Sequence, residues 1–246
     1  MYLSWIIPAY NEEERIEATV RAVDRHLSTK RFEYEITVVD NASADRTAEV
    51  VARLGRELPA VRLIRTSGPG KGWAVRHGML AASGEIRCFA DADNSVSPEQ
   101  ADRFLPLVCA GAPSGGCYDV VIGSIGVPGA VVVEQAQWYR RALGKLAKLV
   151  IRAVSGLWEI HDSQRGFKFF SRRAAQAIFP YQRLTAWGFD FELLLIAKEH
   201  GFAVKELPVT WVNPPGSKVG LKAYATTLAE LVRMKWNDLR GRYRAP

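Results

Sequence analysis

Three apolar segments in the first half of the chain each lead directly into acidic or amide side chains, and this pattern limits the possible folds more than any other. The segments and the residues that follow them are 3–7 with Asn11 and Glu12, 35–39 with Asp40 and Asn41, and 86–90 with Asp91 and Asp93. Apolar runs of this length predict buried strands. Because the carboxyl ends of parallel strands meet at one edge of an open sheet, we expect these polar side chains to line one ligand-binding crevice.

Segments with helical periodicity separate the predicted strands. Helices are predicted at 16–27, 47–58 and 71–82 and from Pro98 onward, and further strands at 61–65 and 119–123. Alternation of this kind is typical of an α/β fold in which a mainly parallel, Rossmann-like sheet carries helices on both faces. The sequence therefore predicts a sheet whose acidic edge binds a ligand.

The second half of the chain is richer in helix. Two long helices, at 138–158 and 221–243, are predicted to be basic and amphipathic, with strands at 167–170 and 204–212 and helices at 172–179 and 190–200 between them. In the first long helix Arg141, Lys145, Lys148 and Arg152 form one stripe, and the opposite side carries Leu143, Leu146, Val150, Ala153, Val154 and Leu157. This pattern favours peripheral contact with a membrane surface, and a solvated basic face is the alternative.

Composition narrows the classes of partner. The chain has 246 residues and a formal net charge of +7, which favours an anionic partner such as nucleic acid, acidic lipid or a phosphorylated small molecule. Nucleic acid is disfavoured, because no recognition helix or aromatic–basic RNA motif is present. No run of apolar residues is long enough to predict a spanning helix. The three cysteines, Cys88, Cys109 and Cys117, contain no CxxC pair, so we expect reduced structural thiols.

The acidic edge has the chemistry of a metal-dependent nucleotide site. Asp91 and Asp93 stand two residues apart at a strand end, and carboxylates suit a hard divalent cation that also binds a diphosphate. The simpler interpretation is that both carboxylates cap the helix that follows Pro98. Gly70-Lys71-Gly72 opens a predicted helix, a position that suits a phosphate, although a plain turn would use the same residues.

The ordered set of motifs resembles the family 2 glycosyltransferases with the GT-A fold. The motifs are Ile-Ile-Pro-Ala-Tyr-Asn-Glu-Glu at 6–13, Val-Val-Asp-Asn-Ala-Ser at 38–43, Gly-Lys-Gly-Trp-Ala-Val-Arg at 70–76, Ala-Asp-Ala-Asp at 90–93 and Ile-Gly-Ser at 122–124. Asp-Ser-Gln-Arg-Gly-Phe-Lys at 162–168, Trp-Gly-Phe-Asp-Phe-Glu-Leu at 187–193 and Pro-Gly-Ser-Lys at 215–218 resemble the dolichyl-phosphate glucosyltransferases in particular. The dolichyl-phosphate mannosyltransferases are more distantly similar. Those glucosyltransferases usually read Gly-Ser-Arg where this chain has Gly123-Ser124-Ile125.

The resemblance implies a donor site built from the first half of the chain. Asp93 would be the main ligand of Mg²⁺ or Mn²⁺, and Asp91 would contact the ribose or share the metal. The remaining donor-binding residues would be Pro8, Tyr10, Glu12, Asp40 and Lys71. For Glu12 the alternative is a role in capping the helix that follows it.

The resemblance also implies an acceptor site in the second half. Asp162 and Gln164 would orient the sugar or the acceptor, with a role for Asp162 as a catalytic base left open, and Trp187 and Asp190 would line the sugar pocket. The acceptor phosphate would meet Ser217, Lys218 and either Arg140 or Arg141.

The expected activity is inverting transfer of a hexose to a polyprenyl or dolichyl phosphate, with glucose from UDP-glucose as the expected donor. The chain is then a single GT-A domain over 1–246, with a nucleotide-binding half at 1–125 and an acceptor-binding half at 126–246. It would act in the cytoplasm as a peripheral protein at the membrane face. The alternatives are GDP-mannose as donor and a soluble hydroxyl acceptor. A nucleotidyltransferase is disfavoured, because no glycine-rich basic loop follows the first strand.

Overall fold

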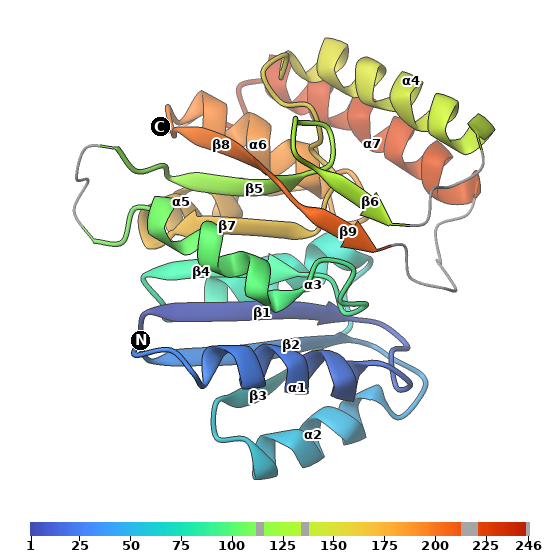
Figure 1. Cartoon of the computed structure of the whole chain (residues 1–246). Helices are drawn as coiled ribbons and strands as arrows, with labels where there is room; N and C mark the ends of the chain where they lie inside the picture. Colours follow the sequence, from blue (N-terminus) through green and yellow to red (C-terminus); the bar gives the residue numbers. More distant parts are fainter. Residues whose placement is uncertain (112–115, 134–137, 213–220, 245–246) are drawn as a thin grey trace.

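A seven-stranded sheet forms the centre of the molecule, with strand order β3-β2-β1-β4-β7-β5-β8 (Figure 1). The computed structural model describes residues 1–111, 116–133, 138–212 and 221–244. The strands are β1 Leu3–Ala9, β2 Tyr34–Asn41, β3 Val61–Thr66, β4 Ile86–Ala90, β5 Val120–Ser124, β7 Phe167–Ser171 and β8 Val204–Pro208. A second sheet pairs β6 Val131–Val133 with β9 Thr210–Val212.

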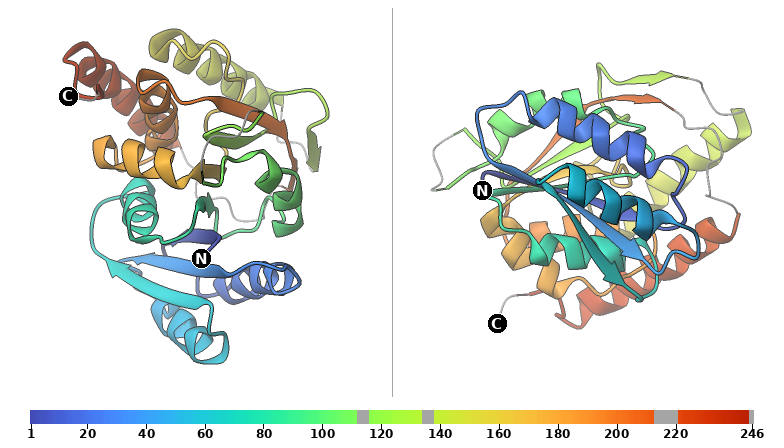
Figure 2. Two further views of the ribbon diagram at one scale, coloured as in Figure 1. Left: turned by 90° about the vertical axis from the view of Figure 1, so that its left-hand side faces the viewer. Right: turned by 90° about the horizontal axis from the view of Figure 1, so that it is seen from below.

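The helices cover both faces of the large sheet, as predicted (Figure 2). They are α1 Ile16–Leu27, α2 Thr47–Glu57, α3 Lys71–Ala81, α4 Trp138–Ser155, α5 Arg172–Ile178, α6 Phe189–Glu199 and α7 Leu221–Leu239, with 3-10 helices η1 Pro98–Arg103, η2 Leu105–Leu107 and η3 Phe179–Tyr181. One core layer packs α1, α2 and η1 against the sheet, and the other packs α3, α5 and α6. The α/β fold class is therefore confirmed. The helix expected from Pro98 is a 3-10 helix.

Strand β7 is the one strand of the large sheet, within the described residues, that runs antiparallel to its neighbours β4 and β5. Phe167 at its start pairs with Ala90 at the end of β4, and Asp91 N donates to Gly166 O at 3.1 Å. The antiparallel direction therefore brings the segment that precedes β7 to the same edge as the carboxyl ends of β1, β2 and β4. This edge is where the predicted site residues of the two halves can meet.

The single strand predicted at 204–212 is two strands, which belong to different sheets. Pro208 ends β8, since proline has no N–H to continue the hydrogen-bond ladder. Val209 then donates to Ser124 O and accepts from Val131 N, both at 3.1 Å, and this turns the chain toward β6. Strand β6 was missed by the sequence analysis, because a three-residue strand gives almost no periodic signal.

The expectation of three reduced thiols is wrong, because Cys109 and Cys117 form a disulfide. The backbone brings them together: Cys109 N donates to Tyr118 O at 2.9 Å, and Tyr118 N donates to Leu107 O at 2.8 Å. A separation of eight residues carries no sequence signal for such pairing. Cys88 is a buried free thiol, as expected, and burial raises its pKa.

Helices α4 and α7 pack side by side at one end of the molecule (Figure 1). The predicted apolar side of α4 is exposed in one part and buried in another. Leu146 is 58% exposed, whereas Leu157, just beyond the helix, is buried. Lys148 of the predicted basic stripe turns toward Asp162 of the protein itself. The chain leaves its helix before the predicted end at Trp158. No helix in the described ranges is long and apolar enough to cross a membrane.

Candidate active site

The carboxyl ends of β1, β2 and β4 meet at one edge of the sheet, as predicted from their polar residues. Each of these ends is followed by a residue with positive φ: Asn11 at 53°, Ala42 at 56° and Asn94 at 54°. These are the non-glycine residues of this kind in the part of the chain that the structure describes. A left-handed backbone is costly for residues with a side chain, and it is found at sites where function requires a particular turn.

The loops after β1 and β2 hold each other in place. Asn11 N donates to Ser43 Oγ at 2.9 Å, and Ala44 N donates to Asn11 Oδ1 at 2.8 Å. Glu12 N donates to Thr47 Oγ1 at 2.8 Å. Because every one of these contacts joins the two loops, the wall of the crevice that they form is a single unit.

The predicted nucleotide contacts lie on or beside this wall. Pro8 is buried within β1, and Tyr10, directly after the strand, is 56% exposed. The carboxylate of Glu12 accepts from the guanidinium of Arg15, with one contact at 3.0 Å. Asp40 is buried at the end of β2; its Oδ2 accepts no hydrogen bond from the described residues but lies 3.7 Å from Arg65 Nε. The wall thus carries an exposed aromatic ring and a buried carboxylate oxygen that can accept a hydrogen bond from a ligand.

Asp91 and Asp93 follow β4 at the centre of the edge. Lys71, at the start of α3, places its Nζ 2.5 Å from Asp91 Oδ1. Burial alone would lower the pKa of Lys71, but the carboxylates of Asp91, Asp190 and Asp93 raise it. Lys71 therefore stays positively charged beside the first carboxylate of the pair.

Asp93 has no ion-pair partner among the described contacts, and the charge of Lys71 only partly offsets the rise in its pKa. Burial and the nearby Asp91 carboxylate raise its pKa, although Ser95 N donates to its Oδ1 at 3.0 Å. A buried carboxylate with a raised pKa gains most from a bound cation. No group of three or more potential ligands is arranged around a metal position in the residues described. Two carboxylates alone do not complete the coordination shell of a divalent cation, which takes six or more oxygen ligands.

A second buried ion pair lies next to the first. Lys168 Nζ, on β7, is 2.5 Å from Asp190 Oδ1, on α6, and both side chains are buried. Burial lowers the pKa of Lys168 and raises the pKa of Asp190. Lys71 also lowers the pKa of Asp190, whereas Asp91 raises it, so these charges act on one another. Asp190 thus lies close to the predicted site, but its direct contact is with Lys168.

Asp162, in the segment that leads into β7, is the centre of a third cluster. Its Oδ2 lies 3.0 Å from both Lys148 Nζ and Arg165 Nε and accepts from Ile125 N at 3.3 Å. Burial would raise the pKa of Asp162, but Arg165 and Lys148 hold it below its usual range. Oδ1 is buried and accepts no hydrogen bond from the described residues. A carboxylate held ionised by two cations is a weak base and a good anchor for them.

For the remaining predicted site residues, the structure describes fewer contacts or no side chain. Trp187, just before α6, is half-buried, with the Lys71 ammonium 5.9 Å from its ring centroid. Gln164 is half-buried within the segment that contains Asp162. Arg140 and Arg141 belong to α4, but their side chains lie outside the described residues, as do Ser217 and Lys218 entirely.

Two cations of the site were missed as functional residues. Lys148 was placed on the basic stripe of its helix, and Arg165 was noted only as part of a motif. The spacing of Arg165 from Asp162, three residues, was the one available signal for that ion pair. No signal in the sequence joins Lys148 to Asp162, because the two residues meet only when α4 packs over the end of the sheet.

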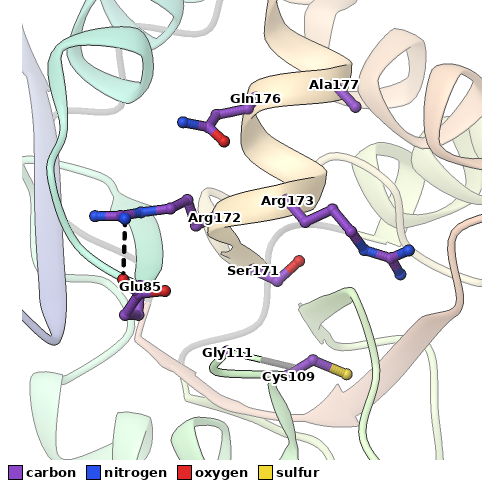
Figure 3. A pocket seen from close by; sticks show the side chains of 8 residues that line it. All are labelled: Glu85, Cys109, Gly111, Ser171, Arg172, Arg173, Gln176 and Ala177. Atoms are coloured by element: carbon purple, nitrogen blue, oxygen red, sulfur yellow. Dashed lines mark ion pairs between the residues drawn. The ribbon is translucent and has the colours of Figure 1, made fainter. Parts of the chain in front are cut away.

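Two cavities lie elsewhere. One, of about 390 Å³, is at the opposite edge of the sheet, where β4 begins and β7 ends (Figure 3). Its two arginines, Arg172 and Arg173, are already paired with Glu85 and Asp119 at 3.0 and 2.6 Å. Another, of about 740 Å³, reaches His161, the neighbour of Asp162. Neither contains a predicted site residue, so the candidate site is the open edge itself.

Residues 4–179 match the family model described as glycosyl transferase family 2. A dolichyl-phosphate beta-glucosyltransferase of Trichomonas vaginalis is 33% identical over 241 residues, which is 95% of this chain and 71% of the relative. Its namesake in Saccharomyces cerevisiae is 30% identical over 259 residues, covering 99% and 77%. The one in Homo sapiens is 30% identical over 227 residues, covering 88% and 69%.

The fold also matches solved structures of a glucosyl-3-phosphoglycerate synthase from Mycobacterium tuberculosis. Its complex with Mn²⁺, uridine-diphosphate and phosphoglyceric acid aligns with a TM-score of 0.69 at 19% identity, covering all of this chain and 79% of that one. The complex with Mn²⁺, uridine-diphosphate-glucose and phosphoglyceric acid gives a TM-score of 0.68 at 20% identity, covering 96% and 80%. At this level of identity the likeness concerns the fold.

Proposed function

The chain belongs to glycosyl transferase family 2, and we propose that it transfers glucose, with inversion, from UDP-glucose to a polyprenyl phosphate. Its relatives at about 30% identity are named dolichyl-phosphate beta-glucosyltransferases. The observation that carries the proposal is the pair of charge clusters at one edge of the GT-A fold. Asp91 and Asp93 form an acidic cluster, and Lys148 and Arg165 form a basic cluster around Asp162.

The acidic cluster serves the donor in this proposal. Mg²⁺ or Mn²⁺ held by Asp91 and Asp93 would neutralise the charge that develops on the departing diphosphate. Lys71 adds a fixed positive charge beside Asp91. Tyr10 and Asp40 lie on the wall formed by the loops after β1 and β2, where they can stack on the base and accept a hydrogen bond from it or from the ribose.

The basic cluster serves the acceptor. A phosphate monoester is largely a dianion at neutral pH, since its second pKa is near ~6, so its attack on the sugar needs little help from a base. Orientation by fixed cations is then the main contribution of the protein. Asp162 holds Lys148 and Arg165 in one place, and its lowered pKa makes it a poor proton acceptor. We therefore assign Asp162 the role of orienting these cations, with Gln164 beside it.

Peripheral contact with a membrane follows from the same proposal. Helix α7 exposes four apolar side chains, which are between 55% and 72% exposed: Leu228, Val232, Trp236 and Leu239. Spacings of four, four and three place them on one side of the helix. Arg240 stacks on the Trp236 ring, with its guanidinium carbon 4.4 Å from the centroid. An apolar stripe flanked by cations suits the surface of an anionic bilayer.

A phosphorylated small molecule is the second candidate acceptor. Two observations favour it: Ile125 occupies the position where an arginine was expected, and the structural neighbours are described with phosphoglyceric acid. The basic cluster would bind either phosphate in the same way. The apolar stripe on α7 favours the lipid, because a small soluble acceptor requires no such surface.

A transfer assay separates these candidates. UDP-glucose and GDP-mannose are each offered with a short-chain polyprenyl phosphate, the unphosphorylated prenol or 3-phosphoglycerate, with Mn²⁺, Mg²⁺ or a chelator. The proposal requires glucose transfer from UDP-glucose to the prenyl phosphate, loss of transfer with the chelator, and no transfer to the prenol. Transfer to 3-phosphoglycerate alone would establish the soluble acceptor, and preference for GDP-mannose would overturn the assignment of the donor.

A further inference from the structure

Glu230, on α7, accepts hydrogen bonds from three consecutive backbone amides of another segment. Ala186 N donates to its Oε1 at 3.0 Å, and Trp187 N and Gly188 N donate to its Oε2 at 2.9 and 2.6 Å. These amides lie in the turn that leads into helix α6, whose N-cap residue is Gly188. The carboxylate therefore fixes the turn that leads into α6, and it places a negative charge at the N-terminal end of that helix, where it is favourable.

The close approach of the two helices is specific to this contact. A Cβ placed on Gly188 would lie 2.6 Å from Phe191 Cζ and 2.8 Å from Glu230 Cβ, so glycine is required both for the Phe191 ring and for α7 to come this near. Helix α7 runs past α6 at this end of the molecule (Figure 1). The absence of a side chain at 188 and the carboxylate at 230 thus form one matched contact.

The same segment is fixed to α3 on its other side. Gly72 N donates to Ala186 O at 3.3 Å, and Trp73 N donates to Thr185 O at 3.2 Å. Lys71, the neighbour of Gly72, then lies over the Trp187 ring and pairs with Asp91. Residues 184–188 therefore form a strap that connects α7 with the start of α3 and with the acidic cluster.

We propose that Glu230 is a positioning residue. It fixes the strap 184–188 so that Trp187 lies against Lys71. In this way it couples α7 to the part of the site that receives the sugar of the donor. This inference rests on the proposed function for the nature of the donor. Glu230 lies outside the motifs that carry the family resemblance, and it touches neither Asp91 nor Asp93. It acts through the strap and not on the reacting atoms.

The position of Glu230 on α7 could link contact with a lipid surface to the donor pocket. Leu228 and Val232, two residues away on either side, belong to the exposed apolar stripe. A shift of α7 on a lipid surface would move the carboxylate and the three amides bound to it. Engagement of the acceptor membrane would in this way reach the donor pocket through a single side chain.

The test compares E230A and E230Q with D238N, which removes a carboxylate from the same helix that pairs only with Lys235 in the described contacts. Amide hydrogen exchange is followed over 184–188, and affinities for UDP and for UDP-glucose are measured with Mn²⁺. E230Q keeps the side-chain volume and one acceptor oxygen. We expect exchange over 184–188 to be roughly tenfold faster or more in E230A, with E230Q between it and the wild type.

The affinities give the functional readout. Affinity for UDP-glucose is expected to fall about tenfold in E230A, whereas affinity for UDP stays nearly unchanged, because the nucleotide meets β1, β2 and β4. D238N should match the wild type in both measurements. Equal losses for UDP and UDP-glucose, or unchanged exchange and affinity in E230A, would overturn the role of Glu230. If the wild type binds UDP but not UDP-glucose, the proposed donor is wrong. The positioning role of Glu230 toward the sugar then falls with it, even if amide exchange over 184–188 is faster in E230A.

Discussion

Lys71 Nζ lies 2.5 Å from Asp91 Oδ1, and this contact makes the two carboxylates that follow β4 unequal. Asp91 is compensated by a cation of the protein itself. Asp93, two residues later, is left with a raised pKa by burial and by Asp91. Of the two aspartates, Asp91 is therefore ion-paired with a cation of the protein, and Asp93 has no such partner among the described contacts.

Replacement of Asp93 by asparagine is expected to remove transfer and to leave the fold intact. Loss of a metal ligand removes several kcal/mol of transition-state stabilisation, which corresponds to about a thousandfold or more in rate. The measurement is glucose transfer, together with the thermal shift produced by UDP and Mn²⁺. D102N, which alters an exposed carboxylate paired with Lys30, is the matched control. Wild-type transfer by D93N would remove the metal from the proposed mechanism.

Replacement of Lys148 by alanine is expected to weaken binding of the acceptor phosphate. Asp162 would keep Arg165 but lose one of its two cations, and we expect the KM for prenyl phosphate to rise about tenfold with little change in the KM for UDP-glucose. Steady-state kinetics measure both KM values in K148A. K148R, which keeps the positive charge, is compared with it, and K30A is the control. An equal rise in both KM values would show that Lys148 serves the whole site and not the acceptor.

Glu192 gives the fold a pH dependence of known sign. Burial raises its pKa from the ordinary value of 4.5 to about 7. Between these values the unfolded carboxyl is ionised while the folded one still binds its proton, so its stabilising contribution is complete below 4.5 and is lost as the pH rises through about 7. Relative to E192Q, the wild type should lose up to ~3 kcal/mol over this range. Denaturant unfolding of both proteins at about pH 4.5 and about pH 8 checks this, and parallel pH profiles would contradict it.

The exposed stripe of α7 predicts salt-sensitive binding to anionic vesicles. Replacing Val232 and Trp236 by serine removes much of the apolar area and should lower the partition coefficient roughly tenfold or more. Co-sedimentation at low and high salt measures it, and L80S, on the exposed side of α3, is the control. If the wild type ignores vesicles at low salt, α7 is not a lipid-binding surface.

The disulfide between Cys109 and Cys117 should contribute to stability and not to transfer. It closes a short loop, with a sequence separation of eight, and loops of this size are stabilised by roughly 2 to 3 kcal/mol. A reductant should therefore lower the melting temperature of the wild type. The C109S/C117S variant should melt at that lower temperature with or without the reductant. Transfer should be equal in both, because the disulfide lies away from the edge that holds Asp91 and Asp93. A reductant-insensitive wild type would show that the two thiols are not joined.

Much of the first half could be predicted from the sequence. The runs before Asp40 and Asp91 are apolar because both faces of their strands are covered, and periodicity reports burial directly. The polar residues stand at strand ends, and parallel strands share an edge by geometry alone. The grouping of the polar residues that follow β1, β2 and β4 at this edge was therefore predictable, and the structure confirms it.

The second half was less predictable for a specific reason. Periodicity identifies the sides of a helix but not which side meets the protein, so it could not show that Lys148 of the basic stripe binds Asp162 while Leu146 of the apolar side is exposed. The reversed direction of β7 and the pairing of Cys109 with Cys117 likewise depend on partners distant in the fold or on loop geometry that leaves no periodic signal.

The sequence by itself determined the alternation of strand and helix, the acidic ends of β1, β2 and β4, and the family to which their motifs belong, because each of these is a local property of neighbouring residues. Only the tertiary structure decided that Lys71 compensates Asp91, that Asp162 holds two cations, and that Glu230 binds the three amides that lead into α6. Contacts of this kind depend on where distant elements pack, and burial then sets the charge of each carboxylate through desolvation and the nearest ion.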